Sequence, residues 1–354
     1  MSPALPACSL KPNSGDLVFL KIGRFGSRHR MRRTFFIVGP TATGKSELAA
    51  DFACETGAEI VNADAFQVYR GLDLLTAKPD ASTLARAPHH LIGTTPLHEE
   101  MNAEKYRCAA SRAIEEIHSR GKLAIVVGGS GLYVKALTHG LASLPESDPK
   151  LRERLNALSL AELRAQLAEL DPDATQRIDM KNRRRVVRAL EICLLTGKPV
   201  STQREQRSVV EDVDFANHRD TPGRSAPTAT GIFVFRDREE LYTRINQRVE
   251  AMFGNGVMEE VQRAGTVSST ASQMIGFREI RQLLDGPADA GSISQCVAAI
   301  QQATRRYAKR QLTWFRRQTN FSALNLSLLT HNEALTLLRL LAERRRVSRV
   351  RAKE

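Results

Sequence analysis

The feature that most constrains this chain is a glycine-containing loop between a predicted strand and a predicted helix. Residues 34–38 (TFFIV) are β-branched or aromatic and predict a buried strand. The strand leads directly into residues 39–46 (GPTATGKS), and residues 47–54 then repeat apolar residues at helical spacing. A strand, a G-x-x-x-x-G-K-S loop and a helix in this order predict a phosphate-binding P-loop.

The residue types in this loop suit a di- or triphosphate ligand. Its two glycines allow the backbone to curl so that N–H groups point inward at phosphate oxygens. Lys45 adds a cation, Ser46 can ligate Mg²⁺, and the start of the following helix favours negative charge. We therefore expect the whole loop to bind phosphate: Gly39, Pro40, Thr41, Ala42, Thr43, Gly44, Lys45 and Ser46.

Further strand and helix patterns predict an α/β fold with a parallel sheet. Residues 59–62 (EIVN) and 123–127 (LAIVV) are typical of buried strands, and residues 103–120 between them are helix-like. The strand at 123–127 ends in residues 128–131 (GGSG), where motor and switch NTPases carry an acid that holds Mg²⁺ and water. The missing acid disfavours those two classes.

The organisation of the chain indicates an insertion in the α/β core. From about residue 148 to 207 the pattern is helical only, with helices expected at 150–158, 160–170 and 182–195. Residues 231–236 (GIFVFR) then predict a strand again, followed by a mainly helical chain to about residue 343. We predict a P-loop NTPase-like parallel sheet core formed by residues 34–141 and 231–330. The other parts are a helical insertion at 142–215, a linker at 216–230 and a C-terminal helix with a basic tail at 331–354.

Charge is concentrated at the two ends of the chain. The formal net charge is +13, but residues 1–33 hold seven bases and one acid, and residues 344–354 hold six bases and one acid. The net charge is thus weak evidence for nucleic-acid binding, and local basic segments carry more information. We expect residues 1–33 to be a disordered extension, either an organelle-targeting segment or a stretch that precedes a true start at Met31.

Cysteine usage and hydropathy exclude several classes of protein. The five cysteines are scattered without a C-x-x-C pair, which excludes a disulfide scaffold or a zinc ribbon and indicates a reducing compartment. No apolar run approaches the ~18 residues that a membrane span needs, and residues 17–20 are too short for a signal peptide. We therefore expect a cytoplasmic protein that does not enter a membrane.

Asp64 follows the predicted strand at 59–62. The carboxyl ends of parallel strands face the ligand crevice, so Asp64 is expected beside the P-loop, where it can bind Mg²⁺ or act as a general base. The alternative from its position alone is an ordinary helix-capping aspartate. His89 and His90 are adjacent and have no metal-ligand spacing, so no metal site is expected there.

Seven motifs occur in one order along residues 34–318. They are GPTATGKS at 39–46, NADAFQVYRGLDLLTAKP at 62–79, PHHLI at 88–92, VGGSGLYVKAL at 127–137, RVVRALEICLLTGKP at 185–199, MIGFREI at 274–280 and RRYAKRQLTWFRR at 305–317. In these motifs the chain resembles the tRNA dimethylallyltransferases, also called tRNA isopentenyltransferases.

The resemblance implies transfer of a dimethylallyl group from dimethylallyl diphosphate to the N6 amine of adenosine at tRNA position 37. It implies that the P-loop and Mg²⁺ hold the diphosphate, and that Asp64 takes the proton of the amine. Ser130 stands where the family usually has threonine, and either hydroxyl can orient Asp64 or the amine. Arg244 and Arg248, at i and i+4 of a predicted helix, match a family pattern and are expected to reach the diphosphate from the opposite side.

Two basic segments support an RNA substrate. One lies at residues 181–188, and the other at 305–317 interleaves bases with Tyr307, Trp314 and Phe315 and contains no acid. Residues 179–183 (DMKNR) depart from the family, which commonly has proline and aspartate there, so contacts just before Arg184 are less secure. The positions that the resemblance implies as tRNA contacts in a monomeric enzyme are Asp64, Ala65, Phe66, Gln67, Ser130, Arg152, Arg184, Arg185, Val186, Val187, Arg188, Met274, Ile275, Gly276, Phe277, Arg278, Glu279, Lys309, Arg310, Gln311, Leu312, Thr313, Trp314, Phe315 and Arg316.

Three other functions remain open at the level of sequence. A prenyltransferase that acts on free adenine nucleotides shares the P-loop but has no need of a helical insertion. A small-molecule kinase would use Asp64 to activate a hydroxyl group. A non-catalytic RNA-binding ATPase module would use the P-loop for ATP alone.

Overall fold

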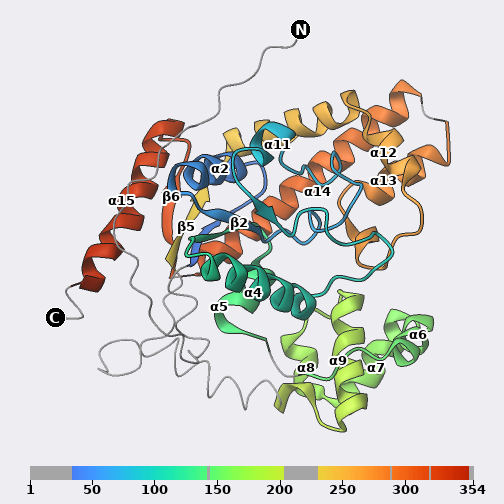
Figure 1. Ribbon diagram of the computed structural model, residues 1–354. Coiled ribbons are helices and arrows are strands. Elements are labelled where there is room, and N and C mark those ends of the chain that lie inside the picture. The colour runs from blue at the N-terminus through green and yellow to red at the C-terminus, as the bar shows by residue number, and fades with distance from the viewer. Residues whose placement is uncertain (1–33, 142–143, 203–229, 288, 319, 351–354) are drawn as a thin grey trace.

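The computed structural model describes residues 34–141, 144–202, 230–287, 289–318 and 320–350 (Figure 1). The expected basic extension at 1–33 lies outside the described residues, as do the last four residues and all of the expected linker except Thr230. No helix within the described residues is both long enough and apolar enough to cross a membrane.

A parallel sheet forms the centre of the molecule. Six strands in the described residues take the order β3-β2-β4-β1-β5-β6, and every neighbouring pair is parallel. The bounds are β1 Thr34–Val38, β2 Glu59–Asn62, β3 His89–His90, β4 Ala124–Gly128, β5 Thr230–Phe235 and β6 Ser322–Asn325. The prediction of a parallel α/β fold is therefore confirmed.

The sequence prediction was wrong for residues 322–325, which were assigned to a mainly helical region. They form the edge strand β6, which pairs in register with β5. The segment SALN has little of the apolar content of the inner strands, because an edge strand has a neighbour on one side only and its residues here are half-buried or exposed. The two-residue strand β3 was also not predicted, since His89 and His90 lack an apolar pattern.

Helices cover both faces of the sheet, as alternation along β1 requires. Phe35 and Ile37 face α2 (Lys45–Thr56) and α15 (His331–Val350), whereas Phe36 and Val38 face the opposite layer. That layer contains α4 (Ala103–Ser119), α5 (Gly131–His139) and the long helix α14 (Ala290–Arg316). The short helix α3 (Ala81–Leu84) precedes β3.

The C-terminal helices form a further core with the segment that follows β2. Val68, Tyr69, Leu72 and Leu75 of that segment are buried against these helices. The helices are α11 (Arg238–Gly254), α12 (Val257–Arg263), the 3₁₀ turn η2 (Ala271–Gln273), α13 (Phe277–Leu284) and α14. Segments that lie about 190 residues apart in the chain thus share one core.

The inserted segment is a helical unit with its own core, at the lower right of Figure 1. Each helix begins where the sequence offers a cap: Asp148, Ser159, Asp171 and Asn182 accept hydrogen bonds from backbone N–H groups of the first turns. The helices are α6 (Pro149–Ala157), α7 (Leu160–Leu170), α8 (Pro172–Arg177) and α9 (Arg183–Thr196).

Glu59 is a buried acid at the first residue of β2, the end of the strand opposite to the one that Asp64 follows. The Glu59 carboxylate lies 2.8 Å from His90 Nε2, 2.7 Å from Arg120 Nη2 and 3.0 Å from Lys122 Nζ, and it forms hydrogen bonds or ion pairs with all three. Burial acts to raise the pKa of Glu59, but the hydrogen bonds from Arg120, His90 and Lys122 outweigh it and lower the pKa to about 2.

We predict that Glu59→Gln lowers the free energy of unfolding by about 1–3 kcal/mol at pH 7, because it leaves three basic partners without their anion. A carboxyl whose pKa is depressed contributes stability above its unfolded pKa and loses it as the pH falls toward the folded value. The difference between the two proteins should therefore shrink below about pH 4.5, toward zero near pH 2. Urea unfolding across this range measures it, and a difference independent of pH would contradict the ion-pair assignment.

Candidate active site

The phosphate loop lies at the carboxyl end of β1, in the middle of the sheet. Gly39 passes so close to β5 that a Cβ atom there would stand 2.1 Å from the carbonyl oxygen of Val234. Gly44 has a φ of 91°, in the left-handed region that favours glycine, and the helix α2 begins at the next residue. The glycines at the two ends of the loop are therefore required by the backbone path.

Lys45 lies half-buried within the loop. Its Nζ atom donates to the carbonyl of Pro40 at 3.2 Å. Burial lowers the pKa of Lys45 to about 8, with the negative charge of Asp64 acting upward and the positive charge of Arg248 acting downward. The positive charge of Lys45 is only partly compensated by Asp64, so its ammonium group is suited to bind an anion that enters the loop.

Three arginines approach the loop from the side of β5 and α11. Arg244 Nε donates to Ala42 O at 2.9 Å, Arg248 Nη1 donates to Thr41 Oγ1 at 2.8 Å, and Arg236 Nε donates to Thr43 O at 2.9 Å. Burial lowers the pKa of Arg248 to about 10, so its guanidinium stays charged at neutral pH. Its Nε atom is buried and has no hydrogen-bond partner among the described residues. An unpaired buried donor beside Lys45 fits an anionic ligand.

Arg244 and Arg248 line the same pocket as the P-loop, whereas Arg236 was not predicted from the sequence. Arg236 directly follows β5, so its guanidinium lies at the same edge of the sheet as the P-loop and Asp64. The rule that ligands bind at the carboxyl ends of strands, which pointed to Asp64, would have found Arg236 as well.

Asp64 lies in the turn after β2, and its Oδ1 atom accepts hydrogen bonds from the backbone N–H groups of Phe66 at 2.9 Å and Gln67 at 3.3 Å. Asp64 thus caps a turn and not a helix, because residues 65–68 form a turn. Ser130 Oγ accepts from the N–H of Ala65 at 2.9 Å. The serine hydroxyl thus orients the backbone beside Asp64.

One pocket of about 410 Å³ joins these groups. It is lined on one side by Thr41, Lys45, Ser46, Arg244 and Arg248, and on another by Asn62, Asp64 and Gln67. Apolar or weakly polar side chains complete the wall: Leu74, Ala77, Ile92, Ala251 and Met252. The pocket therefore combines the cations Lys45, Arg244 and Arg248 with carboxylates, among them Asp64, and with an apolar surface.

The long helix α14 contacts both loops of the site. Gln311 accepts from Thr41 N at 3.0 Å and donates to Gly129 O at 2.8 Å. The Trp314 ring lies so close to Gly131 that a Cβ atom there would stand 2.6 Å from it. Burial and the charge of Asp64 raise the pKa of the Tyr307 hydroxyl, which places this tyrosine in the same electrostatic environment. A single helix thus sets the distance between the P-loop and residues 128–131.

The opposite side of α14 carries a basic stripe. Its exposed residues recur at three- and four-residue intervals, whereas Thr304, Ala308, Gln311 and Phe315 are buried. The exposed residues are Arg306, Lys309, Arg310, Thr313, Arg316 and Arg317. We call this set the α14 stripe.

The basic segment of α9 divides into exposed and internally paired residues. Arg184 and Arg185 are exposed. Arg188 Nη1 and Arg152 Nη2 instead contact Glu191 Oε2 at 2.6 and 3.0 Å, and Glu191 is fully buried. Burial acts to raise the pKa of Glu191, but the hydrogen bonds from Arg188 and Ser147 and the charge of Arg152 lower it.

Several of the expected tRNA contacts have side chains inside the protein. Val186 and Val187 are buried in the core of the helical unit, and Met274, Phe277 and Phe315 are buried in the other cores. These apolar side chains are buried in cores, whereas their neighbours Arg184, Arg278 and Arg316 are exposed. The expected contacts therefore lie on α9, on α13 with the three residues before it, and on α14, with Arg152 on α6, Ser130 just before α5, and Asp64 to Gln67 in the turn after β2.

The donor set offers little for a protein-held metal. Within the part of the chain that the structure describes, no three His, Cys, Asp or Glu side chains come together as a metal site. Ser46 and Asp64 nevertheless both line the pocket. Such a sparse set fits Mg²⁺, which is usually bound by one or two protein groups together with substrate phosphates and water.

Comparisons with known proteins agree with one another. Residues 67–318 match the family model described as IPP transferase. The chain is 44% identical over 290 residues to a tRNA dimethylallyltransferase of Geobacter sulfurreducens, covering 79% of this chain and 88% of that protein. Among solved structures, it is similar to the full-length tRNA isopentenylpyrophosphate transferase of Bacillus halodurans, with a TM-score of 0.60 and 30% identity over 89% of this chain and 99% of that one. The tRNA delta(2)-isopentenylpyrophosphate transferase of Staphylococcus epidermidis gives a TM-score of 0.59 and 31% identity over 88% and 99%. The chain therefore belongs to the IPP transferase family.

Proposed function

We propose that this protein transfers a dimethylallyl group from dimethylallyl diphosphate to the N6 amine of adenosine at tRNA position 37. The observation that carries the proposal is the single pocket that joins the P-loop cations, an apolar wall and Asp64. The relatives named above are tRNA dimethylallyltransferases or isopentenylpyrophosphate transferases, which supports the same reaction.

The cationic end of the pocket suits a diphosphate leaving group. The reaction breaks the bond between C1 of the allyl group and the bridging oxygen, and the bonding electrons leave with the diphosphate. Lys45, Arg244 and Arg248 neutralise the charge that grows on those oxygens. Mg²⁺, held by Ser46 and the diphosphate, adds further positive charge when it is bound.

Asp64 is the group that we assign to the proton. The amine nitrogen forms the new bond to C1 and must then lose one proton, which Asp64 accepts. The N–H groups of Phe66 and Gln67 hold the carboxylate by Oδ1, and Ser130 fixes the intervening backbone. Activation of water is not required, which suits a site whose neighbouring strand β4 ends in glycines rather than an acid.

The RNA surface of this proposal consists of the α14 stripe and the exposed start of α9. These arginines and lysines are suited to phosphates of the anticodon stem-loop, and the target base must leave its stack to enter the pocket. We further propose that the protein acts as a monomer in the cytoplasm.

Incubation of the full chain with radiolabelled dimethylallyl diphosphate, Mg²⁺ and either tRNA or free adenine nucleotides tests the proposal. We expect label in tRNA at the N6 position of adenosine 37. Label in free nucleotide alone would reject an RNA substrate, and ATP turnover without prenyl transfer would favour a kinase or an ATPase.

We predict that Asp64→Asn lowers kcat by about 10²–10⁴-fold, because the amide has nearly the same shape but cannot accept the proton. The affinity for tRNA should remain within a factor of a few, since the amide oxygen still accepts from Phe66 N. Single-turnover transfer and filter binding measure the two quantities. Near-normal turnover would reject Asp64 as the base.

Lys45 should make diphosphate binding depend on pH. Its pKa is about 8 in the ligand-free protein, and only the charged form attracts the ligand, so affinity should fall as the pH rises above 8, by up to tenfold per unit. Calorimetry with inorganic diphosphate from pH 7 to 9.5 measures this fall. Lys45→Met should bind more weakly and lack the inflection, and titration of the ligand itself is common to both proteins. A wild-type profile parallel to that of Lys45→Met would contradict the assignment.

Arg184→Ala should weaken tRNA binding and reduce the slope of log K against log salt by about one, because it removes one phosphate contact. Arg339→Ala provides a control, since Arg339 on α15 pairs with Glu55 on α2, and α15 lies away from the helical unit (Figure 1). An unchanged slope for Arg184→Ala would contradict a phosphate contact at this position.

A further inference from the structure

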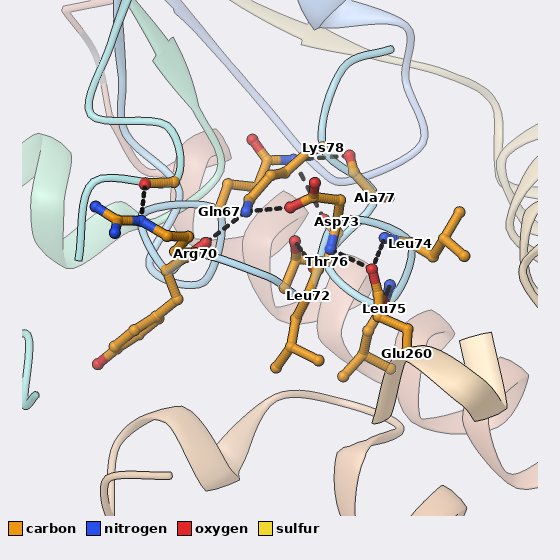
Figure 2. A network of polar contacts seen from close by, with 12 residues as sticks. Gln67, Arg70, Leu72, Asp73, Leu74, Leu75, Thr76, Ala77, Lys78 and Glu260 are labelled. Carbon is orange, nitrogen blue, oxygen red and sulfur yellow. Dashed lines mark hydrogen bonds and ion pairs between the residues drawn. The ribbon is translucent and has the colours of Figure 1, made fainter. Parts of the chain in front are cut away.

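A polar network in the wall of the pocket connects α12 to residues 72–78 and, through them, to Gln67 (Figure 2). Glu260 on α12 accepts three hydrogen bonds from consecutive backbone N–H groups. Its Oε1 atom accepts from Asp73 N at 2.6 Å and Leu74 N at 2.9 Å, and its Oε2 atom accepts from Leu75 N at 2.9 Å. One side chain thus holds a segment that lies about 185 residues earlier in the chain.

These three N–H groups need an external acceptor because of the shape of the segment. Thr76 N bonds to Leu72 O at 3.2 Å and Lys78 N bonds to Asp73 O at 3.0 Å, so residues 72–78 form a short helical turn. The first N–H groups of such a turn have no partner within it. Glu260 satisfies all three with a single charge, which makes it the cap of this turn.

The other end of the turn fixes Gln67. Gln67 Nε2 donates to Thr76 O at 3.3 Å and to Ala77 O at 2.8 Å, which uses both hydrogens of the amide (Figure 2). Two carbonyl acceptors require the NH₂ group at this place, so the amide cannot be reversed. Gln67 lines the pocket together with Asp64. The part of the amide left for a ligand is the oxygen, Oε1, which can only accept a hydrogen bond.

We propose that Glu260 is a positioning residue for base recognition. By capping residues 73–75 it holds the carbonyls of Thr76 and Ala77, and these hold Gln67 with its acceptor oxygen toward the substrate. An acceptor in this place favours a base with an exocyclic amine and disfavours a base with a carbonyl group at the same position. The inference rests on the proposed function, because it assigns the selection of adenine in that same site.

The local packing gives Glu260 a role apart from folding. Val257 and Val261 of α12 are completely buried in the core with Tyr69 and Leu72, and that apolar contact already joins the helix to the segment. Lys78 Nζ also closes the segment through Tyr69 O and Asp73 Oδ1. The hydrogen bonds of Glu260 therefore act mainly on the orientation of the turn.

The test measures kcat and KM for an anticodon stem-loop hairpin with adenosine at position 37. Glu260→Ala should lower kcat/KM on the order of 10- to 100-fold, because a misplaced contact of this kind costs about that much. Glu260→Gln should have a smaller effect, since its oxygen still accepts but its NH₂ faces an N–H group. Glu259→Ala, at the exposed neighbouring position, is the matched control and should leave kcat/KM unchanged within twofold.

A double-mutant cycle separates positioning from general stability. Gln67→Met keeps the length of the side chain and removes the amide. If Glu260 acts through Gln67, Gln67→Met combined with Glu260→Ala should be no worse than Gln67→Met alone. Effects that multiply would overturn the proposal.

Selectivity is the second measurement. A hairpin with inosine at position 37 carries a carbonyl in place of the amine, and it should inhibit wild type more weakly than an unreactive adenosine hairpin does in binding competition. The ratio of the inhibition constant of the inosine hairpin to that of the adenosine hairpin should fall toward one in both Glu260→Ala and Gln67→Met. An unchanged ratio would overturn the proposal even if Glu260→Ala melts at a lower temperature. If Glu260→Ala does not fold, the same ratio measured in Glu260→Gln tests the proposal, and an unchanged value there would overturn it. Absence of transfer by wild type would instead reject the proposed function.

Discussion

Two half-buried cations, Lys45 of the phosphate loop and Arg248 of α11, impose the arrangement of the rest of the site. Taking Lys45 and Arg248 out of water is costly unless an anion compensates them, and the acid whose charge acts on both is Asp64. This incompletely compensated positive charge lies at the carboxyl end of β1, an inner strand of the sheet. A diphosphate supplies the missing charge, so the free energy of binding is concentrated on the group that later departs. Asp64, in the turn after β2, lines the same pocket as Lys45 and Arg248, so the group assigned to the proton lies beside the cations.

The helix α14 links this pocket to the exposed α14 stripe. Its buried side contacts the P-loop and residues 128–131 through Gln311 and Trp314, while its exposed side presents the basic stripe. One helix carries both sides, so under the proposed function an RNA bound to the stripe would be held in a fixed position relative to Lys45 and Asp64. Gly129 and Gly131 are needed for this seating, since a Cβ atom at either position would stand within 2.6 Å of α14 side chains.

Local sequence signals predicted those parts of the site that a single segment encodes. The P-loop is contiguous, and Asp64 follows an apolar strand, so the parallel fold and the location of both groups could be read directly. Contacts between segments that lie far apart in the chain could not be predicted in this way. Nothing near Glu260 indicates that its carboxylate caps residues 73–75, and nothing near Glu191 indicates that it binds Arg152 and Arg188. The strand β6 was missed for a related reason, because its pairing with β5, and not its composition, makes it a strand.

Contacts between distant segments also distinguish the two basic segments from each other. In sequence, residues 181–188 and 305–317 are equivalent runs of positive charge. In the structure the first run is partly used internally, since Arg188 is bound to the buried Glu191 and to Pro145 O, and Arg183 donates to the carbonyls that end α6. The second run keeps its exposed charges along one side of α14. Charge that is already satisfied within the protein gains little from an RNA phosphate, because binding must first break an existing contact. The electrostatic contribution to tRNA affinity should therefore come more from α14 than from α9, although the two segments look alike in the sequence.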